Sequence, residues 1–506
     1  MKKGEIFPLL FFWLKFLHKN FTLFNTMDMN LHTSLVQNLK ELKKNLISDD
    51  ITFLDLVIGK KKGVLIFIND LVNKDMLGEL ILRPLSNTEN NLDEKKVFDL
   101  FLSPEKKELF DFDSLYNDLL SGNAILLYED SNVCLSFGLK HFEKRAITEP
   151  PTSTVIKGPR EGFVETLSVN VSMMRRKLKS KDLIFENMTV GKFSSTSISV
   201  CYVRGIADKK LVDKVKKRLK KIDIDAVLDS SYISKFLSEH SFSMFKQIGN
   251  TEKPDILAGK ILEGRVAIFV DGSPIALTVP YLLIEDFQSA SDYYNSSYSA
   301  TVARYIRVFS VVLALFLPAL YVSAELFHLQ LIPLSFLLTI VNSIKGLPLS
   351  PSYEMFFTLL IFEILNEASV RMPKYVGMVV SIVGGLVLGE TAVNAGIISA
   401  PALMIVALSG ICLYTVPELE QIFSILRILF LLIAGTLGLY GILVFVALLT
   451  VYLITFESYS TPLCAPFSPL ITQDMKDGLY KGFLKELDKR PKSLKNKNKL
   501  RIGKEK

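Results

Sequence analysis

The feature that most limits how this chain can fold is a long apolar block from Val308 to Phe456. Inside it, the stretch 375–401 carries small residues at successive four-residue steps, which places them on one face of a helix. Such small-residue seams let helices pack closely in membranes. In water each glycine would cost ~1 kcal/mol relative to alanine, whereas in a bilayer the backbone must bond within its own helix. We therefore predict an integral membrane protein with a helix-packing seam at Gly377, Ser381, Gly385 and Gly389.

Charge is distributed unevenly along the 506 residues. The chain is charge-rich up to Ala303 and nearly charge-free through the apolar block, and the tail after Thr472 is rich in lysine. The mean hydropathy of +0.32 is high for a soluble protein. Because many cations lie in the tail, we attribute the net charge of +7 to contact with membrane lipid rather than to nucleic acid. A soluble domain, a transmembrane domain over 301–470 and a basic tail over 471–506 are predicted.

The first residues, 1–30, form an uncertain extension. An apolar run follows Lys2 and Lys3, but Lys15 and Lys19 interrupt it, and no small-residue cleavage site follows. The run is also too short to span a bilayer. We expect either an amphipathic surface helix or a later start, at Met27 or Met29.

The soluble part shows signs of duplication. The β-rich runs 63–70 and 197–205 are each followed by a helical pattern, and 119–139 parallels 261–283, with Gly122 matching Gly264. The turn 129–131 matches the turn 271–273 in the same alignment. We predict two similar α/β subdomains, over 31–144 and 196–300. The Pro- and Gly-rich connector over 145–195 is expected to have a structural or subunit-contact role rather than a ligand-binding one.

The apolar block divides into several helices. Apolar runs are expected at 308–324, 353–370, the seam helix, 397–414 and 422–456, whereas 331–344 is short enough to be interfacial or re-entrant. The last run is too long for one straight crossing, and Gly438 to Gly441 can turn it into a hairpin. Arg304 and Arg307 before the first span indicate that the soluble domain is cytoplasmic. With a cytoplasmic tail as well, the number of crossings is even, four or six.

Carboxylates inside the apolar block are the candidate functional residues, since an ionisable group at membrane depth is costly. Glu363, Glu367 and Arg371 are four residues apart and share a helix face, and Glu390 follows the seam. In one interpretation these residues line or gate a water-filled path in a symmetric oligomer. In the other, Glu367 pairs with Arg371, and Glu363 is hydrogen-bonded or protonated inside a helix bundle. Both interpretations remain open from the residues alone.

Catalytic and metal-binding patterns do not emerge from the sequence. The spacing of Cys134, Cys201, Cys412 and Cys464 fits neither a metal nor a redox site, and the five histidines are scattered. Serine-hydrolase, zinc-protease and phosphate-loop motifs are missing too. The sequence therefore predicts a protein that is not an enzyme and has no cofactor.

Four segments resemble one known family. SIVGGLVLGETAVNAGIIS at 381–399 is similar to the signature of the A subunits of spore germinant receptors, the GerA family, and the segments 145–165, 317–333 and 362–377 agree with it. The resemblance covers most of the chain from Ile51 to Pro469. Asn366 and Ser369 depart from it, since the family more often has Arg and Gly there.

The resemblance implies a receptor subunit of the inner spore membrane, in which several copies form or gate an ion-conducting path that triggers germination. It also implies a transporter-like B subunit and a C lipoprotein as partners. An accessory A-type protein associated with the dipicolinic-acid channel is the alternative within the family. A secondary transporter and a membrane scaffold are the alternatives outside it.

Overall fold

A computed structural model describes residues 30–140 apart from 87–96, 99, 102 and 104, and then 157–372 and 385–501 apart from 386 and 388. The predicted extension lies outside these residues except for its last position, as do Gly377 and Ser381 of the seam. The chain divides into two compact units: an α/β unit that includes Arg160–Ile233 and Asn250–Leu277, and a helical unit that includes Ser234–Gly249 and everything from Thr278 onward. Each unit is described by itself.

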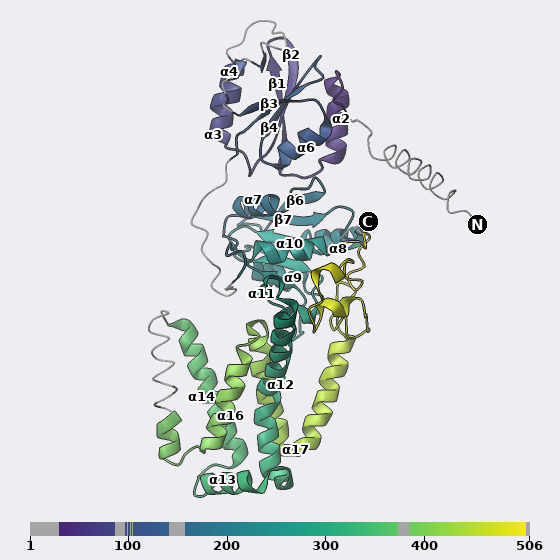
Figure 1. Cartoon of the computed structure of the whole chain (residues 1–506). Coiled ribbons are helices and arrows are strands. Elements are labelled where there is room, and N and C mark those ends of the chain that lie inside the picture. Colours follow the sequence, from purple (N-terminus) through teal and green to yellow (C-terminus); the bar gives the residue numbers. More distant parts are fainter. Residues whose placement is uncertain are drawn as a thin grey trace, which may run out of the picture. The chain divides into compact units, whose positions relative to one another are not determined.

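The α/β unit begins with a five-stranded antiparallel sheet in the order β1-β2-β4-β5-β3 (Figure 1). Its elements are α2 (Leu35–Asn45), β1 (Ile51–Ile58), β2 (Lys61–Ile68), α3 (Lys74–Leu77), a π-helical turn (Gly78–Leu82), α4 (Arg83–Ser86), β3 (Lys106–Leu109), α6 (Phe112–Leu120), β4 (Ala124–Tyr128) and β5 (Cys134–Phe137).

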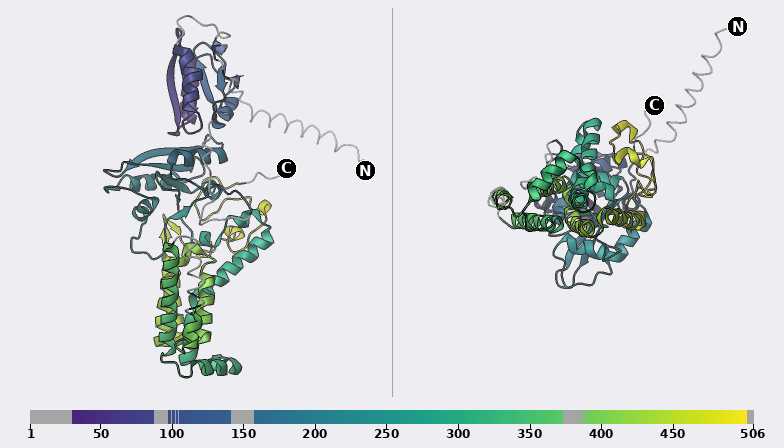
Figure 2. Two further views of the ribbon diagram at one scale, coloured as in Figure 1. Left: turned by 90° about the vertical axis from the view of Figure 1, so that its left-hand side faces the viewer. Right: turned by 90° about the horizontal axis from the view of Figure 1, so that it is seen from below.

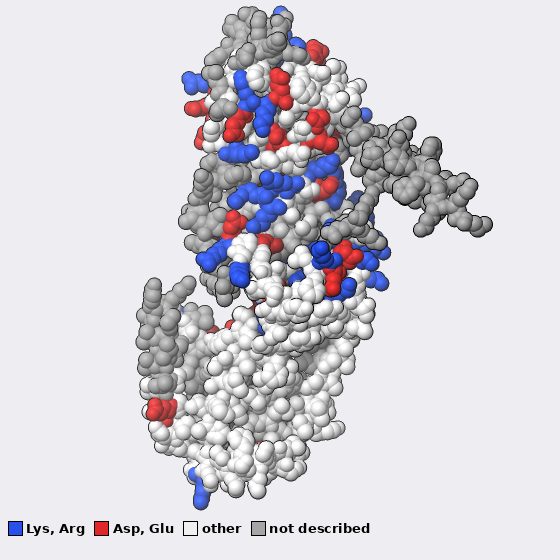
Figure 3. All heavy atoms as spheres, in the orientation of Figure 1, with Lys and Arg blue, Asp and Glu red and all other residues white. Residues whose placement is uncertain are grey.

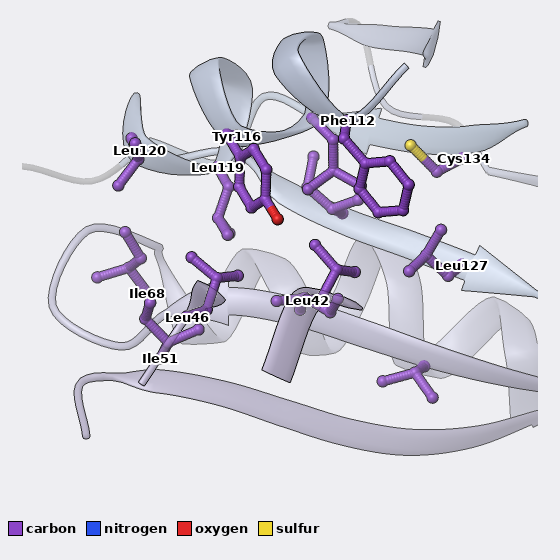
Figure 4. Close-up of a cluster of buried hydrophobic side chains, with 14 of the residues drawn as sticks. Leu42, Leu46, Ile51, Ile68, Phe112, Tyr116, Leu119, Leu120, Leu127 and Cys134 are labelled. Atoms are coloured by element: carbon purple, nitrogen blue, oxygen red, sulfur yellow. The ribbon is translucent and has the colours of Figure 1, made fainter. Parts of the chain in front are cut away.

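Both faces of this sheet are covered, since every residue of β2 from Gly63 to Ile68 is buried. Val64, Ile66 and Ile68 alternate onto the face that packs against α2 and α6, where Leu42 and Leu119 are fully buried (Figure 4). The intervening residues Leu65 and Phe67 point to the opposite face, where α3, the π-helical turn and α4 cover them. The first subdomain is therefore a sheet between two helical layers.

A second sheet repeats the same order as β6-β7-β9-β10-β8. Its elements are α7 (Leu167–Lys177), β6 (Leu183–Val190), β7 (Thr196–Val203), α8 (Lys209–Leu219), α9 (Ser230–Leu237), β8 (Gly249–Thr251), α10 (Pro254–Leu262), β9 (Val266–Val270) and β10 (Ala276–Val279). The predicted pair of similar α/β subdomains is confirmed. The predicted connector is shorter than expected, because α7 and β6 lie within 145–195 and already belong to the second subdomain.

A buried asparagine clamp occurs at the same place in both subdomains. Asn38 in α2 accepts the N–H of His32 at 2.8 Å and donates to the His32 carbonyl at 2.6 Å. Asn170 in α7 makes the same two bonds with Val164, at 2.9 and 2.6 Å. Since each clamp satisfies both polar groups of a buried side chain, it fixes how the chain enters the first helix. The duplication therefore extends to individual hydrogen bonds.

The matched glycines also have equivalent roles. Gly122 and Gly264 both adopt positive φ, at 90° and 101°, and each follows a helix. Both donate their N–H to the carbonyl three residues earlier, which ends the helix and turns the chain into the next strand. In the two hairpin turns, Asp130 and Gly272 both have positive φ. The alignment predicted from the sequence is thus confirmed in backbone geometry.

A buried ion pair joins the two subdomains. Arg175 of α7 donates from Nε and Nη2 to the two carboxylate oxygens of Asp50, each at 2.8 Å, and Nη2 also donates to Ser48 Oγ at 2.9 Å. Both members of the pair are almost fully buried, with 1% and 3% of their side chains exposed. The Ser48 hydroxyl in turn accepts the N–H of Phe185 in β6 at 2.8 Å. The two subdomains are therefore held in register by polar groups that water does not reach.

The helical unit consists of α11 (Ser291–Tyr294), α12 (Ser297–Phe327), α13 (Leu334–Ile344), α14 (Pro351–Arg371), α16 (Ala400–Leu413) and α17 (Glu420–Thr455). Short 3-10 turns occur at Leu283–Phe287, Leu329–Leu331, Pro417–Leu419, Asp474–Asp477 and Leu484–Glu486, and β11 (Glu457–Ser458) pairs with β12 (Thr461–Pro462). Helices α16 and α17 pack against α12, as two further views show (Figure 2). Among the described residues, the helices at Ser297–Phe327 and Pro417–Thr455 are long and apolar enough to cross a membrane.

Helix α17 folds back on itself, as the sequence predicts. Gly438 interrupts it with φ 61° and ψ −149°, which are not helical values. The rings of Phe430 and Phe445 lie 4.7 Å apart between centroids, a contact that two residues so far apart in one straight helix cannot make. The long apolar run is therefore a helical hairpin with its turn at Gly438.

The C-terminal tail packs rather than trailing freely. Leu494 is buried in a small apolar cluster with Leu282, Ile284 and Ala465. The segment 278–296, predicted to close the second subdomain, lies in the helical unit together with this tail. The boundary between the two units therefore falls earlier than the predicted residue 301.

Candidate functional site

The first predicted carboxylate, Glu363, lies in a polar network between the helices. Its Oε1 accepts hydrogen bonds from Arg427 Nη2 and from Ser424 Oγ, both on α17. Arg427 is almost completely buried, with 1% of its side chain exposed, and Glu363 is 23% exposed. The guanidinium also lies over the ring of Phe362, with its carbon 5.6 Å from the ring centroid.

The network continues to two further helices. Arg427 Nη1 donates to Ser409 Oγ of α16 at 3.0 Å, and the Ser409 hydroxyl donates to the carbonyl of Ala314 in α12 at 2.8 Å. Four helices are thus tied together through one guanidinium. Because a buried charge is tolerable only when paired and hydrogen-bonded, Arg427 and Glu363 depend on each other. Arg427 was not among the residues predicted for the site.

Glu367 and Arg371 form a separate pair on the surface of α14. Arg371 Nε donates to Glu367 Oε1 at 2.7 Å, and the two side chains are 78% and 65% exposed for Arg371 and Glu367 respectively. Glu390 is also exposed. The structure therefore does not join the four predicted residues into one constellation. It places the partly buried Glu363 against Arg427 and leaves the other three on the surface of the chain.

The described part of the seam has two different environments. Gly389 is buried, and a Cβ added there would lie 3.1 Å from Leu403 Cδ2 of α16. Gly385 is exposed, and an added Cβ would meet no described atom within 4 Å. The two glycines thus differ in what they face: Gly389 packs within the chain, whereas Gly385 has open space beside it.

Asn366, one of the two departures from the family pattern, connects three helix ends. Its Nδ2 donates to Glu420 Oε1 at 2.7 Å, and its Oδ1 accepts the Tyr414 hydroxyl at 2.8 Å. The uncharged amide of Asn366 therefore links α14 to the end of α16 and to the start of α17, at a position where the family more often has an arginine.

The two arginines expected before the first span lie inside α12 and are paired. Arg304 Nε and Arg307 Nη1 donate to Asp292 Oδ2 at 3.1 and 2.8 Å, and Arg304 Nη2 donates to Asp477 Oδ1 at 3.1 Å. Burial alone would raise the pKa of Asp292, but the hydrogen bonds and charges of Arg307 and Arg304 outweigh it and hold that pKa below its usual range. These arginines therefore fix the base of α12 to the C-terminal tail.

Three further groups, Tyr321, Glu325 and Glu354, were not singled out from the sequence. Tyr321 and Glu325 lie near the C-terminal end of α12, and Glu354 lies at the start of α14; all three are buried. The signal that could have found the two glutamates is a carboxylate at the end of an apolar run, since Glu325 directly follows 308–324 and Glu354 is the second residue of 353–370. Their arrangement is taken up below.

A duplicated α/β unit followed by apolar helices with a buried ion pair defines a class of two-part proteins whose second half is suited to a bilayer. The face of the helices in Figure 3 is almost free of charged side chains, whereas the α/β unit carries both signs. The family model described as "Bacillus/Clostridium GerA spore germination protein" matches residues 37–493, and the chain belongs to this family.

Three relatives show how far the similarity extends. Spore germination protein KA of Bacillus subtilis is 36% identical over 93% of this chain and 89% of its own length. The uncharacterized membrane protein YfkQ of the same organism is 34% identical over 91% of this chain and 92% of its own, and spore germination protein GerLA of Bacillus cereus is 31% identical over 93% and 97%. None of these names describes an enzyme.

The N-terminal domain of the A subunit of the Bacillus megaterium germinant receptor GerK3 is similar to part of the chain. It is 29% identical and covers 51% of this chain and 99% of its own, with a TM-score of 0.40.

Proposed function

We propose that this protein is the membrane subunit of a nutrient-sensing spore germinant receptor, and that several copies form or gate an ion-conducting path. In this proposal it lies in the inner spore membrane with its α/β unit in the cytoplasm, beside a transporter-like B subunit and a C lipoprotein. Membership of the germination family over nearly the whole chain supports this function more strongly than any other observation.

The exposed charges on the helices support an assembly of several copies. Glu367, Arg371 and Glu390 are exposed on helices whose other surface residues are mostly apolar. A charged side chain facing lipid at the bilayer centre costs ~2.5–3.5 kcal/mol. Such groups are tolerated where they face water or another protein surface, which a ring of subunits around a path provides. The prediction that these residues line or gate a water-filled path is therefore part of the proposal.

Gly385 supports the same arrangement. A leucine in place of Gly385 fits in the single chain, because the position is exposed and no described atom lies near the added Cβ. A second copy packed against the seam would leave no such room, because small residues are selected where two helix backbones approach closely. A leucine at this position thus distinguishes an isolated chain from an assembled one.

Potassium release from germinating spores tests the proposal, with protein level checked by immunoblot and contact between copies by chemical cross-linking. We expect Gly385→Leu to abolish both cross-linking and release, and Glu390→Gln and Glu367→Gln to reduce release or change its ion preference. Val387→Leu is the matched control, because Val387 is 47% exposed on the same helix and is already bulky.

Normal cross-linking and release in Gly385→Leu, with the protein present, would contradict assembly through the seam. Unchanged release in both carboxylate variants would show that these groups pack or pair without lining a path. Glu363→Gln is unsuitable for this test, since it also removes the partner of buried Arg427 and would confuse folding with conduction.

A further inference from the structure

A buried carboxylate lies at the end of α12. Glu325 is in the last turn of that helix and is 7% exposed, and neither of its carboxylate oxygens makes a hydrogen bond of good geometry with any described residue. Tyr321 lies one turn earlier on the same face and is also 7% exposed, and within the described part of the chain its hydroxyl makes no hydrogen bond of good geometry. Three buried oxygen atoms from one helix face therefore lack a well-formed hydrogen bond to the residues that the structure describes.

A second carboxylate nearby has the opposite environment. Glu354 is in the first turn of α14 and is 1% exposed, and its Oε1 accepts the backbone N–H of Ser399 at 2.5 Å. Ser399 is the N-cap of α16, so Glu354 lies where the N-termini of two helices meet. The partial positive charge of helix N-termini and a bonded N–H both stabilise a carboxylate anion. Glu354 is thus suited to carry the negative charge.

Among the described residues, no cation offsets a second negative charge at Glu325. It lies at the C-terminal end of α12, where the helix dipole disfavours an anion. The titratable groups that act on it are Tyr321 of α12 and Glu354 of α14, and neither is a cation. The apolar cluster around Tyr321 adds Ile340 of α13, Ala402 of α16 and Leu431 of α17. An unpaired carboxylate in such surroundings takes up a proton rather than remaining charged.

We propose that Glu325 is a proton-binding site, with the carboxyl group held in its neutral form between the packed ends of α12, α14 and α16. Release passes this proton to water and leaves a carboxylate beside the anion of Glu354. Two like charges in an apolar cluster repel each other, so release requires the helix ends to separate or water to enter. The site couples proton binding to the packing of three helices, and it does not depend on the function proposed above.

Infrared spectroscopy of the purified full chain in lipid nanodiscs tests this proposal directly, because a protonated carboxyl group has its own C=O stretching band. We expect a band that disappears reversibly as the pH is raised from about 5 to about 9 and that is absent in Glu325→Gln. Thermal unfolding supplies a second measurement. The wild type should lose stability over the same pH range, whereas Glu325→Gln, which has the shape of the neutral acid, should not.

Tyr321→Phe is a second variant that keeps the test possible if Glu325→Gln does not fold. It keeps Glu325 but removes the neighbouring hydroxyl, so it should shift the band without abolishing it. A spectrum in which neither variant changes any carboxyl band would show that Glu325 is ionised, and the proposal would be wrong. Stabilisation of the wild type by potassium or sodium over a bulky organic cation, lost in Glu325→Gln, would instead identify a metal cation as the ligand and also overturn it.

Discussion

In the helical unit, the environment of each carboxylate depends on which group, if any, neutralises its charge. Glu363 was a candidate from the sequence because a carboxylate in an apolar helix is unusual, but its partner, Arg427, is 64 residues away in the chain. No local pattern connects the two, since the pair forms only when α14 packs against α17. Nothing in the sequence distinguishes Glu363, which has a guanidinium beside it, from Glu325, for which the described residues supply no cation.

The dependence of Arg427 and Glu363 on each other gives a measurable prediction. Arg427→Met removes the cation and leaves a partly buried carboxylate, so we expect it to destabilise the full chain by ~3–5 kcal/mol. Adding Glu363→Gln to that variant should recover much of the loss, because the uncompensated charge is then gone. Thermal unfolding of the two single variants and the double variant in one detergent measures the coupling. Losses that simply add would mean that the pair is not coupled.

At the scale of elements, backbone conformation decides where the last apolar run turns. The sequence indicated a turn between Gly438 and Gly441 from length alone, and the structure places the break at Gly438. Its φ of 61° with ψ of −149° is a region that only glycine enters without strain. A side chain there would also meet Phe327 of α12, with Cδ2 3.0 Å from an added Cβ.

Gly438→Ala is therefore expected to destabilise the protein by ~1–3 kcal/mol, from backbone strain together with displacement of Phe327. Thermal unfolding of the full chain, followed by circular dichroism, measures the change. Gly259→Ala is the comparison variant, since Gly259 lies within α10 and an added Cβ meets nothing within 4 Å. That substitution should leave stability unchanged or raise it by up to ~1 kcal/mol. Equal effects of the two substitutions would argue against a special role for the turn.

At the scale of the whole molecule, the two similar subdomains of the α/β unit are held together by a polar joint. That joint is the Arg175–Asp50 pair, and Asp70 lies within its electrostatic range. Burial, followed by the negative charge of Asp50, raises the pKa of Asp70 to about 6 from an ordinary value of 3.8. Because the folded-state pKa is the higher one, the stabilising effect is complete below the ordinary pKa and is lost as the pH rises through about 6.

Asp70→Asn should therefore flatten the pH dependence of this unit. Between about pH 4 and about pH 7 the wild type loses protection of the β2 amides against hydrogen exchange, after correction for intrinsic exchange rates, and the variant loses less. The two proteins should be alike at the acid end and differ at the neutral end. Asp75→Asn is the control, since Asp75 is exposed in α3. A variant that follows the wild type throughout would show that Asp70 does not control this dependence.

The sequence by itself determined the properties that depend on neighbouring residues. It separated an apolar helical block from two similar α/β halves, aligned Gly122 with Gly264, and located the turn in the last helix. Hydrophobic periodicity and glycine backbone freedom act over a few residues, and the printed chain contains them completely. Helix α7 and strand β6 lie within the predicted connector, in a stretch that contains neither proline nor glycine, so the composition of 145–165 was extended too far along the chain.

Only the tertiary structure decided which polar groups meet. It paired Glu363 with Arg427, tied Asp50 to Arg175, left Glu367 and Glu390 on the surface, and placed Glu325 close to Glu354 with no cation supplied by the described residues. The electrostatic energy of a side chain depends on burial and on charges within a few ångströms in space. Those neighbours come from helices and strands far apart in the chain, so their identity is fixed only when the elements pack.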